Sequence, residues 1–286
     1  MIWEHLREEE FEEAIVKSKG VCVMPVGCLE MHGQHLPVGS DILEASYVLR
    51  KAAEIEPVCV FPNFTFGCVQ GHTNHKGGVI LTVELMQRLM TELCDEIGRN
   101  GFTKILLFNS HGGNISFLNN FVRSTMYSKK SYVVFTFFNN PANPYILMDL
   151  LEKNGRDYFP EMTDEDIEVL RDFVDKKKTL GHACFGETAF MLGSYPELVR
   201  MDKIHALSGL STERTKHLDE AGLTNSTRFW NANFPNAYSG HAPEGCNKRI
   251  GDATVRVMTE NLANALHVLK EDCEALKIND EWNNSW

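Results

Sequence analysis

The amino-acid sequence predicts an α/β fold in which a mostly parallel central sheet carries helices on both faces. Short apolar runs rich in valine, leucine and phenylalanine alternate with longer amphipathic segments, and this order is typical of parallel strands connected by helices. The 286 residues are 43% hydrophobic, which is sufficient to bury a sizeable core. Because no flexible spacer, low-complexity tract or internal repeat interrupts them, we expect one domain spanning 1–286.

Each element follows from its pattern of apolar residues. The first strand, Val21 to Val26, is short, rich in valine and ends in Pro-Val-Gly, as buried strands do. The clearest helix runs from Glu84 to Arg99, where apolar residues recur at steps of three and four. An N-terminal helix begins the chain, and an irregular region follows Asn140. In chain order we expect strands at 21–26, 58–61, 79–83, 104–108 and 132–138, helices at 42–55, 84–99, around 117–122, 164–177, 188–192 and 252–276, and a loop at 231–249.

The first strand leads into the segment with the highest density of reactive side chains, GCLEMHGQHLPVGSD at 27–41. Its carboxylates and imidazoles are Glu30, His32, His35 and Asp41, and the glycines and proline between them impose an irregular backbone. A Glu-x-His pair in extended backbone turns both side chains to the same side. Oxygen and nitrogen ligands at this density predict a borderline divalent metal ion.

Two later segments also combine histidine, glycine and polar residues. His111 lies in a tight glycine turn directly after a predicted strand, and His182 and Glu187 lie shortly before a predicted helix. Ligands in open α/β sheets bind beyond the carboxyl ends of the strands, so His111 and Glu30 can face the same rim. A helix N-terminus favours the carboxylate of Glu187, which makes it a plausible metal ligand.

Charge, hydropathy and cysteine usage exclude several classes of function. The 28 basic and 39 acidic residues give a formal net charge of -11, which repels phosphate backbones and gives no reason to expect nucleic-acid or membrane binding. The apolar runs are too short to span a bilayer and the first residues lack the layout of a signal peptide, so we expect a cytoplasmic protein with reduced cysteines. The sequence contains no G-x-S-x-G elbow, H-E-x-x-H helix, P-loop or G-x-G-x-x-G fingerprint.

Together these motifs resemble those of the creatininase (creatinine amidohydrolase) family. The family's marks are a strand leading into Glu-x-His-Gly-x-His-Leu-Pro-x-Gly-x-Asp, a central Asn-x-His turn and a later Gly-His-Ala segment. All three occur here in order between Val21 and Thr188, with a weaker match at Gly251 to Thr254. The resemblance implies a three-layer α/β/α sandwich, a binuclear divalent metal centre, hydrolysis of amide C–N bonds and homo-oligomers, often hexamers.

Carried over by position, the resemblance also implies a set of metal ligands. Asp41 would bridge two ions, and zinc, manganese and iron all accept such a mixed nitrogen and oxygen set. Creatininase uses a further glutamate two residues after the central histidine, where this chain has Gly113. Glu187, in the Glu-Thr that other branches of the family carry after Gly-His-Ala, is the candidate replacement. The implied ligands are Glu30, Asp41 and His111 for one ion, and His32, Asp41 and Glu187 for the other.

In the expected mechanism of amide hydrolysis, metal ions activate the nucleophile and the carbonyl, and a separate residue donates a proton. Two divalent ions can hold a bridging hydroxide and polarise the carbonyl. The leaving nitrogen still needs a proton, and His182 is the expected general acid because imidazole ordinarily titrates near neutral pH. Glu187 is expected to act as a ligand, as an acid–base group, or as both.

The remaining histidines have lesser expected roles. His72 and His75, in GHTNHKGG, match a family segment that lines the cleft, and we expect them to contact the substrate. His35 is either a ligand or a residue that supports the ligands, and His241 is a candidate cleft residue. The histidines expected at the surface are His5, His205, His217 and His267.

The expected substrate is a small non-peptide molecule with a cyclic amide or formamide-type C–N bond. Creatininase packs its substrate with tryptophans from the middle of the chain, and this chain has none there, so an aromatic wall would come from residues such as Phe138, Tyr145 or Phe185. The alternatives are creatinine amidohydrolase proper, a metal-dependent peptidase of the same family, and a non-catalytic metal-binding oligomeric protein. The four tryptophans are Trp3, Trp230, Trp282 and Trp286.

Overall fold

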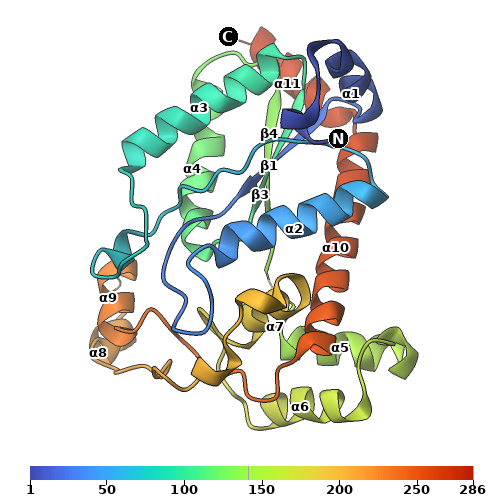
Figure 1. Cartoon of the computed structure of the whole chain (residues 1–286). Coiled ribbons are helices and arrows are strands. Elements are labelled where there is room, and N and C mark those ends of the chain that lie inside the picture. Colours follow the sequence, from blue (N-terminus) through green and yellow to red (C-terminus); the bar gives the residue numbers. More distant parts are fainter. Residues whose placement is uncertain (141, 224, 286) are drawn as a thin grey trace.

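The computed structural model describes residues 1–140, 142–223 and 225–285, and its centre is a four-stranded parallel sheet (Figure 1). The strand order is β2-β1-β3-β4. Strand β1 (Val21–Val26) pairs with β2 (Cys59–Val60) on one side and with β3 (Lys104–Asn109) on the other, and β3 also pairs with β4 (Val133–Phe138). The predicted α/β fold with a parallel sheet is therefore confirmed.

Alternate residues of β1 face two separate apolar cores, one on each side of the sheet. Val21 and Val23 pack with helices α2 (Ser40–Ile55), α7 (Phe185–Ser194) and α10 (Lys248–Glu271). Cys22, Met24 and Val26 pack with α3 (Val83–Arg99) and α4 (Ile115–Ser124) on the opposite side. This alternation, which follows from the two-residue period of a strand, produces the three layers that the family resemblance implies. Helices α5 (Pro144–Asn154) and α6 (Asp164–Asp175) extend the first core.

The other described elements are short helices and 3-10 turns at the edges of these layers. Helices α8 and α9 lie together beside the segment that contains the turn η3, away from α10 (Figure 1). Among the described residues, no helix combines the length and apolar character needed to cross a membrane. The bounds are α1 Phe11–Lys17, α8 Lys216–Glu220, α9 Ser226–Asn233 and α11 Glu274–Asn284, with 3-10 turns η1 Trp3–His5, η2 Glu8–Glu10, η3 Gln70–His72, η4 Gly112–Asn114, η5 Thr125–Tyr127, η6 Arg156–Tyr158, η7 Pro196–Leu198 and η8 Met201–Lys203.

The strand predicted at 79–83 is wrong. No described strand pairs with this segment; instead the Val79 amide donates to the Leu29 carbonyl at 3.2 Å, and Thr82 caps helix α3 by accepting from the Leu85 amide. The side chains of Val79 and Val83 are 36% and 51% exposed. The apolar composition of 79–83 suggested a strand, but none of the described strands lies where it could pair with this segment.

Helix α5 was missed within the region predicted to be irregular after Asn140, of which residue 141 lies outside the described residues. Its start carries a recognisable signal, because the Asn143 side chain accepts from the amides of Tyr145 and Ile146 and Pro144 occupies the first turn. The predicted helix at 252–276 is two helices, α10 and α11, that separate at Asp272. The helix predicted at 188–192 begins earlier, so Glu187 lies within its first turn.

Candidate metal centre

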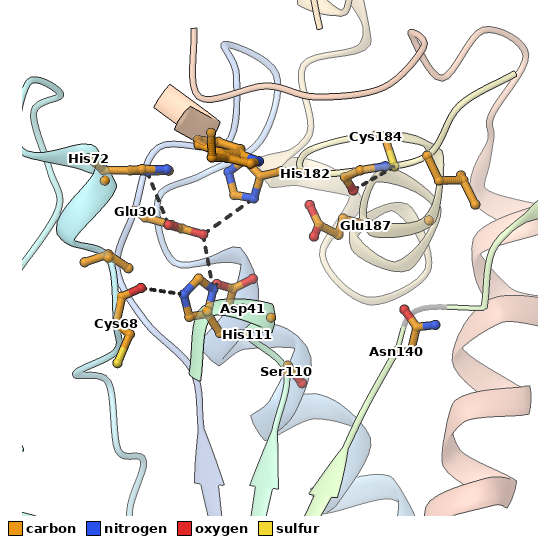
Figure 2. A pocket seen from close by; sticks show the side chains of 18 of the residues that line it. Glu30, Asp41, Cys68, His72, Ser110, His111, Asn140, His182, Cys184 and Glu187 are labelled. Atoms are coloured by element: carbon orange, nitrogen blue, oxygen red, sulfur yellow. Dashed lines mark hydrogen bonds and ion pairs between the residues drawn. The ribbon is translucent and has the colours of Figure 1, made fainter. Parts of the chain in front are cut away.

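The predicted site residues that follow β1 and β3 meet at the carboxyl-terminal edge of the sheet (Figure 2). The loop after β1 packs directly on helix α2, since a Cβ atom on Gly27 would lie 2.6 Å from the Ile42 backbone nitrogen. This close approach brings Glu30, which is buried, next to Asp41 in the first turn of α2. The helix N-terminus favours the negative charge of Asp41.

The two carboxylate oxygens of Asp41 face two different imidazoles. Asp41 Oδ2 lies 2.9 Å from His111 Nδ1, and Asp41 Oδ1 lies 3.2 Å from His32 Nε2. Glu30 Oε1 also approaches His111 Nδ1, at 3.2 Å. Asp41 thus lies between two groups of nitrogen and oxygen donors, the arrangement expected of a carboxylate that bridges two ions.

Three imidazoles at the site share one pattern of contacts. Each directs one ring nitrogen at a backbone carbonyl: His32 Nδ1 at Glu30 O (3.2 Å), His111 Nε2 at Cys68 O (3.2 Å) and His182 Nε2 at Met31 O (2.7 Å). The other ring nitrogen of each faces a carboxylate. Metal-binding histidines have this arrangement, because a hydrogen bond to one nitrogen fixes the tautomer and aims the other at the ion.

The turn that carries His111 is fixed by two asparagines. Asn109 binds the backbone of His111 in both directions, accepting from its amide and donating to its carbonyl. Asn114 accepts from the Cys68 amide and donates to the Gly27 carbonyl, which ties three loops together. At Gly113, where creatininase would have its glutamate, a Cβ atom would lie 2.4 Å from His111 Nε2. A side chain at this position therefore does not fit the observed turn.

Helix α7 brings Glu187 to the same centre. Glu187 Oε2 accepts from the Ala183 amide and lies 3.8 Å from His32 Nε2. Ala183 adopts a left-handed conformation with φ 58°, and this turn aims the preceding His182 towards Glu30, with His182 Nδ1 3.5 Å from Glu30 Oε1. The imidazoles of His182 and His32 lie against each other at a centroid distance of 4.1 Å, tilted by 39°.

The donor set fits divalent metal ions. Three groups each have ligand atoms within 4.8 Å of one another, and Glu30 Oε1 is buried without a hydrogen bond although two histidine nitrogens point at it. Nitrogen, oxygen and sulfur donors in such sets suit zinc and related borderline ions. The groups are Cys28, Glu30, Asp41 and His111; Glu30, His32 and His182; and His32, Asp41 and Glu187.

Burial and neighbouring charged groups shift the pKa values of several residues at the centre. Burial by itself would lower the pKa of His32, but the neighbouring carboxylate of Asp41 outweighs it and raises that pKa to about 10. Burial likewise opposes the charge of Glu30, yet His111 and His182 hold its pKa below the ordinary range. Burial raises the pKa of Glu44, whose two oxygens have no hydrogen-bond partner. Because metal ligation needs neutral imidazoles, metal binding at this centre must displace protons.

A cavity of about 480 Å³ opens above the centre, and its lining includes residues that the sequence did not indicate. Trp230 of α9 stacks on His72 at a centroid distance of 5.2 Å and an interplanar angle of 20°, and it makes a T-shaped contact with His182 at a centroid distance of 5.6 Å. Nothing in the sequence near Trp230 marks it as a site residue, because only tertiary packing brings α9 over η3. Ser110 and Asn140 also line the cavity.

Of the two histidines predicted to contact substrate, only His72 lines the cavity. His72 lines the cavity, with Nδ1 3.2 Å from Glu30 Oε2. His75 does not belong to the cavity lining and lies against His72 at a ring distance of 5.9 Å. Of the predicted aromatic residues, Phe138 lines the cavity, whereas Tyr145 and Phe185 do not.

The other histidines lie away from the cavity. His35 is buried, with Nε2 3.1 Å from the Thr188 hydroxyl beside Glu187, a position that supports the ligands rather than joining them. His241 binds the backbone of Thr179 and does not line the cavity. The predicted surface histidines, His5, His205, His217 and His267, are all exposed.

Comparisons with known proteins agree with this geometry. The sequence profile of the creatininase family, described as creatinine amidohydrolase, matches residues 4–266. The chain belongs to the creatininase family. A creatinine amidohydrolase of Pseudomonas putida is 24% identical over 209 residues, which are 68% of this chain and 72% of that protein. Family membership confirms the predicted class of enzyme, a metal-dependent amidohydrolase.

Solved creatininase structures share the fold. A creatininase variant of Zn–Zn type has a TM-score of 0.70 at 20% identity, covering 95% of this chain and 98% of its own. A structure described as creatininase Mn has a TM-score of 0.68 at 20% identity, covering 95% and 99%. The predicted divalent-metal requirement agrees with these relatives and with the donor groups found here.

Proposed function

We propose that this protein hydrolyses a cyclic amide or formamide-type C–N bond of a small non-peptide molecule at a binuclear metal centre. The observation that carries the proposal is the position of Asp41, whose two oxygens face His111 and His32 at 2.9 and 3.2 Å. A carboxylate shared in this way can neutralise charge between two cations. The proposed ligands are Glu30, Asp41 and His111 for one ion, and His32, Asp41 and Glu187 for the other.

Amide hydrolysis requires a strong nucleophile and a proton for the leaving nitrogen, and the proposed centre can supply both. Bound divalent ions would lower the pKa of a water molecule to roughly 7 and polarise the scissile carbonyl. His182 lines the cavity beside the ligands, and its Nε2 is engaged by the Met31 carbonyl. Its Nδ1 is therefore the atom that would carry a proton to the leaving nitrogen. Glu30 Oε1 lies 3.5 Å from this Nδ1 and would hold the orientation of the imidazole.

The size and the lining of the cavity favour a small, flat and polar substrate. A volume of about 480 Å³ suits a small ligand rather than a folded polypeptide. Trp230 and Phe138 provide aromatic surface, while Ser110 and Asn140 provide hydrogen-bonding groups. Planar rings with amide edges match this combination.

Creatinine itself is the second candidate substrate. The Pseudomonas putida relative is a creatinine amidohydrolase, and Trp230 supplies an aromatic surface although no tryptophan occurs in the middle of the chain. The absence of mid-chain tryptophans therefore argues less strongly against creatinine than the sequence alone suggested. We also propose that the protein forms homo-oligomers, such as hexamers, as the family resemblance implies, and that it is cytoplasmic, as the short apolar runs and the first residues of the sequence suggest.

A turnover screen tests the proposal. Purified protein loaded with Zn²⁺ or Mn²⁺ is assayed against creatinine, cyclic ureides, formamidopyrimidines and short peptides by release of amine or formate. We expect turnover of a cyclic amide or formamide other than creatinine, abolished by chelation and in Asp41→Ala, which should also lose both ions in elemental analysis. Efficient turnover of creatinine or of peptides alone would refute the substrate class. A full metal complement in Asp41→Ala would refute the bridging role.

A further inference from the structure

A buried thiol lies against the proposed metal ligands and has no part in the roles described so far. Cys28 follows β1 by two residues and is 0% exposed. Its Sγ donates to Asp41 Oδ2 at 2.8 Å. The potential ligand atoms of Cys28, Glu30, Asp41 and His111 all lie within 4.8 Å of one another.

The thiol is held in this position by its surroundings. A Cβ atom on Gly67 would lie 2.5 Å from Cys28 Cβ and 2.8 Å from the Gly27 carbonyl oxygen, so backbone covers Cys28 closely. Within the same group, Glu30 Oε1 is buried without a hydrogen bond. A buried carboxylate oxygen that faces two imidazole nitrogens without a hydrogen bond, next to a thiol and a second carboxylate, is the environment that a cation would complete.

We propose that Cys28 is the fourth protein donor to the ion held by Glu30, Asp41 and His111, and that its sulfur makes this site prefer Zn²⁺ to Mn²⁺. The inference rests on the metal centre of the proposed function. On binding, a sulfur–metal bond forms, the S–H···O hydrogen bond to Asp41 breaks and the thiol proton passes to solvent. Sulfur, nitrogen and oxygen donors in one set of four suit Zn²⁺, whereas Mn²⁺ prefers oxygen ligands.

Cobalt substitution distinguishes this role from a purely positioning one, in which the thiol only donates to Asp41. Metal-free protein is titrated with Co²⁺, and the near-ultraviolet sulfur-to-cobalt charge-transfer band is recorded. We expect the band in the wild type and its loss in Cys28→Ser and Cys28→Ala. The matched control is Cys68→Ser, because Cys68 lines the same cavity while its sulfur points away from His111 (Figure 2). This control should keep the band.

Affinity measurements supply a second readout. Cys28→Ser should lower the affinity for Zn²⁺ by at least about tenfold, because even supporting groups around a metal typically contribute that much. The affinity for Mn²⁺ should change much less, and circular dichroism should show unchanged secondary structure in the variants.

Two results would overturn the inference: tight Co²⁺ binding without the band in the wild type, or a band that persists in Cys28→Ser. Either result would leave the proposed metal centre intact. A failure of the wild type to bind Co²⁺ at all would overturn both this inference and the proposed function.

Discussion

At the scale of single residues, the proposed function assigns metal binding and proton transfer to two neighbours in one segment. Glu187 and His182 are five residues apart, yet Glu187 reaches His32 from the first turn of α7, whereas His182 faces Glu30 and the cavity. The left-handed conformation of Ala183 separates these two directions. The difference in position predicts different consequences for two substitutions by glutamine.

Glu187→Gln should lower metal occupancy, because it removes a negative ligand from the site that also uses His32 and Asp41. His182→Gln should retain both ions but reduce kcat by about 10² to 10⁴, the usual contribution of an acid–base residue. Elemental analysis and steady-state kinetics on both variants provide the test. Metal loss in His182→Gln together with normal metal content in Glu187→Gln would show that the roles are reversed, since the structure also groups His182 with Glu30 and His32.

At the scale of elements, a buried carboxylate joins two helices of the larger core. Asp166 of α6 is 1% exposed and receives hydrogen bonds from the Arg249 side chain at 2.6 and 2.8 Å and from Asn247 at 2.7 Å, both at the start of α10. Burial raises the pKa of Asp166, but the hydrogen bonds from Arg249, the Thr163 amide and Asn247 outweigh burial and hold it well below the usual range. The ionised form is therefore the one that stabilises the fold.

Asp166→Asn should reduce the free energy of unfolding at pH 7 by about 2 kcal/mol, the size expected for hydrogen bonds to a charged group. Because the folded-state pKa is depressed, this stabilisation is complete above the unfolded-state pKa of about 3.9 and is lost as the pH falls below it. Urea denaturation of metal-free protein between pH 7 and pH 3 should show the wild type and the variant converging. Asp164→Asn is the control, because the Asp164 side chain is 88% exposed in its pair with Arg156. A constant difference across this pH range would contradict the argument.

At the scale of the whole molecule, the metal centre connects parts of the chain that belong to different layers. Its proposed ligands come from the loop after β1, from α2, from the turn between β3 and α4, and from α7. Ions bound to all four should stabilise the complete fold, because they bind the folded state in preference to the unfolded chain.

Chelation should consequently lower the Tm. At a free metal concentration of about 100 times Kd, one ion contributes about 2.7 kcal/mol, which in a protein of this size corresponds to a shift of roughly 4 to 5 °C. Differential scanning calorimetry with and without chelator measures the shift. Asp41→Ala should have a Tm that does not respond to chelator. An equal Tm for metal-loaded and metal-free wild type would exclude a structural contribution from the ions.

The sequence by itself determined the fold class and the family, and it supplied most of the proposed ligands. Short apolar runs and period-3.6 patterns indicate the strands and helices of an α/β fold, and the spacing from Glu30 to Asp41 places several proposed ligands in one loop. These signals are local, because each depends on residues that are near one another along the chain. The wrong strand prediction at 79–83 shows the limit of these local signals, because a strand also needs a neighbouring strand to pair with, and composition does not reveal one.

Only the tertiary structure brought Trp230 over His72 and Cys28 against Asp41. The sequence does not distinguish Cys28 from the other cysteines, and Trp230 belongs to none of the motifs that predicted the site. Their importance depends on how α2, the loop at Gly67 and α9 pack around the edge of the sheet. Contacts between segments far apart in the chain follow from the whole set of packing interactions, and no local pattern encodes them.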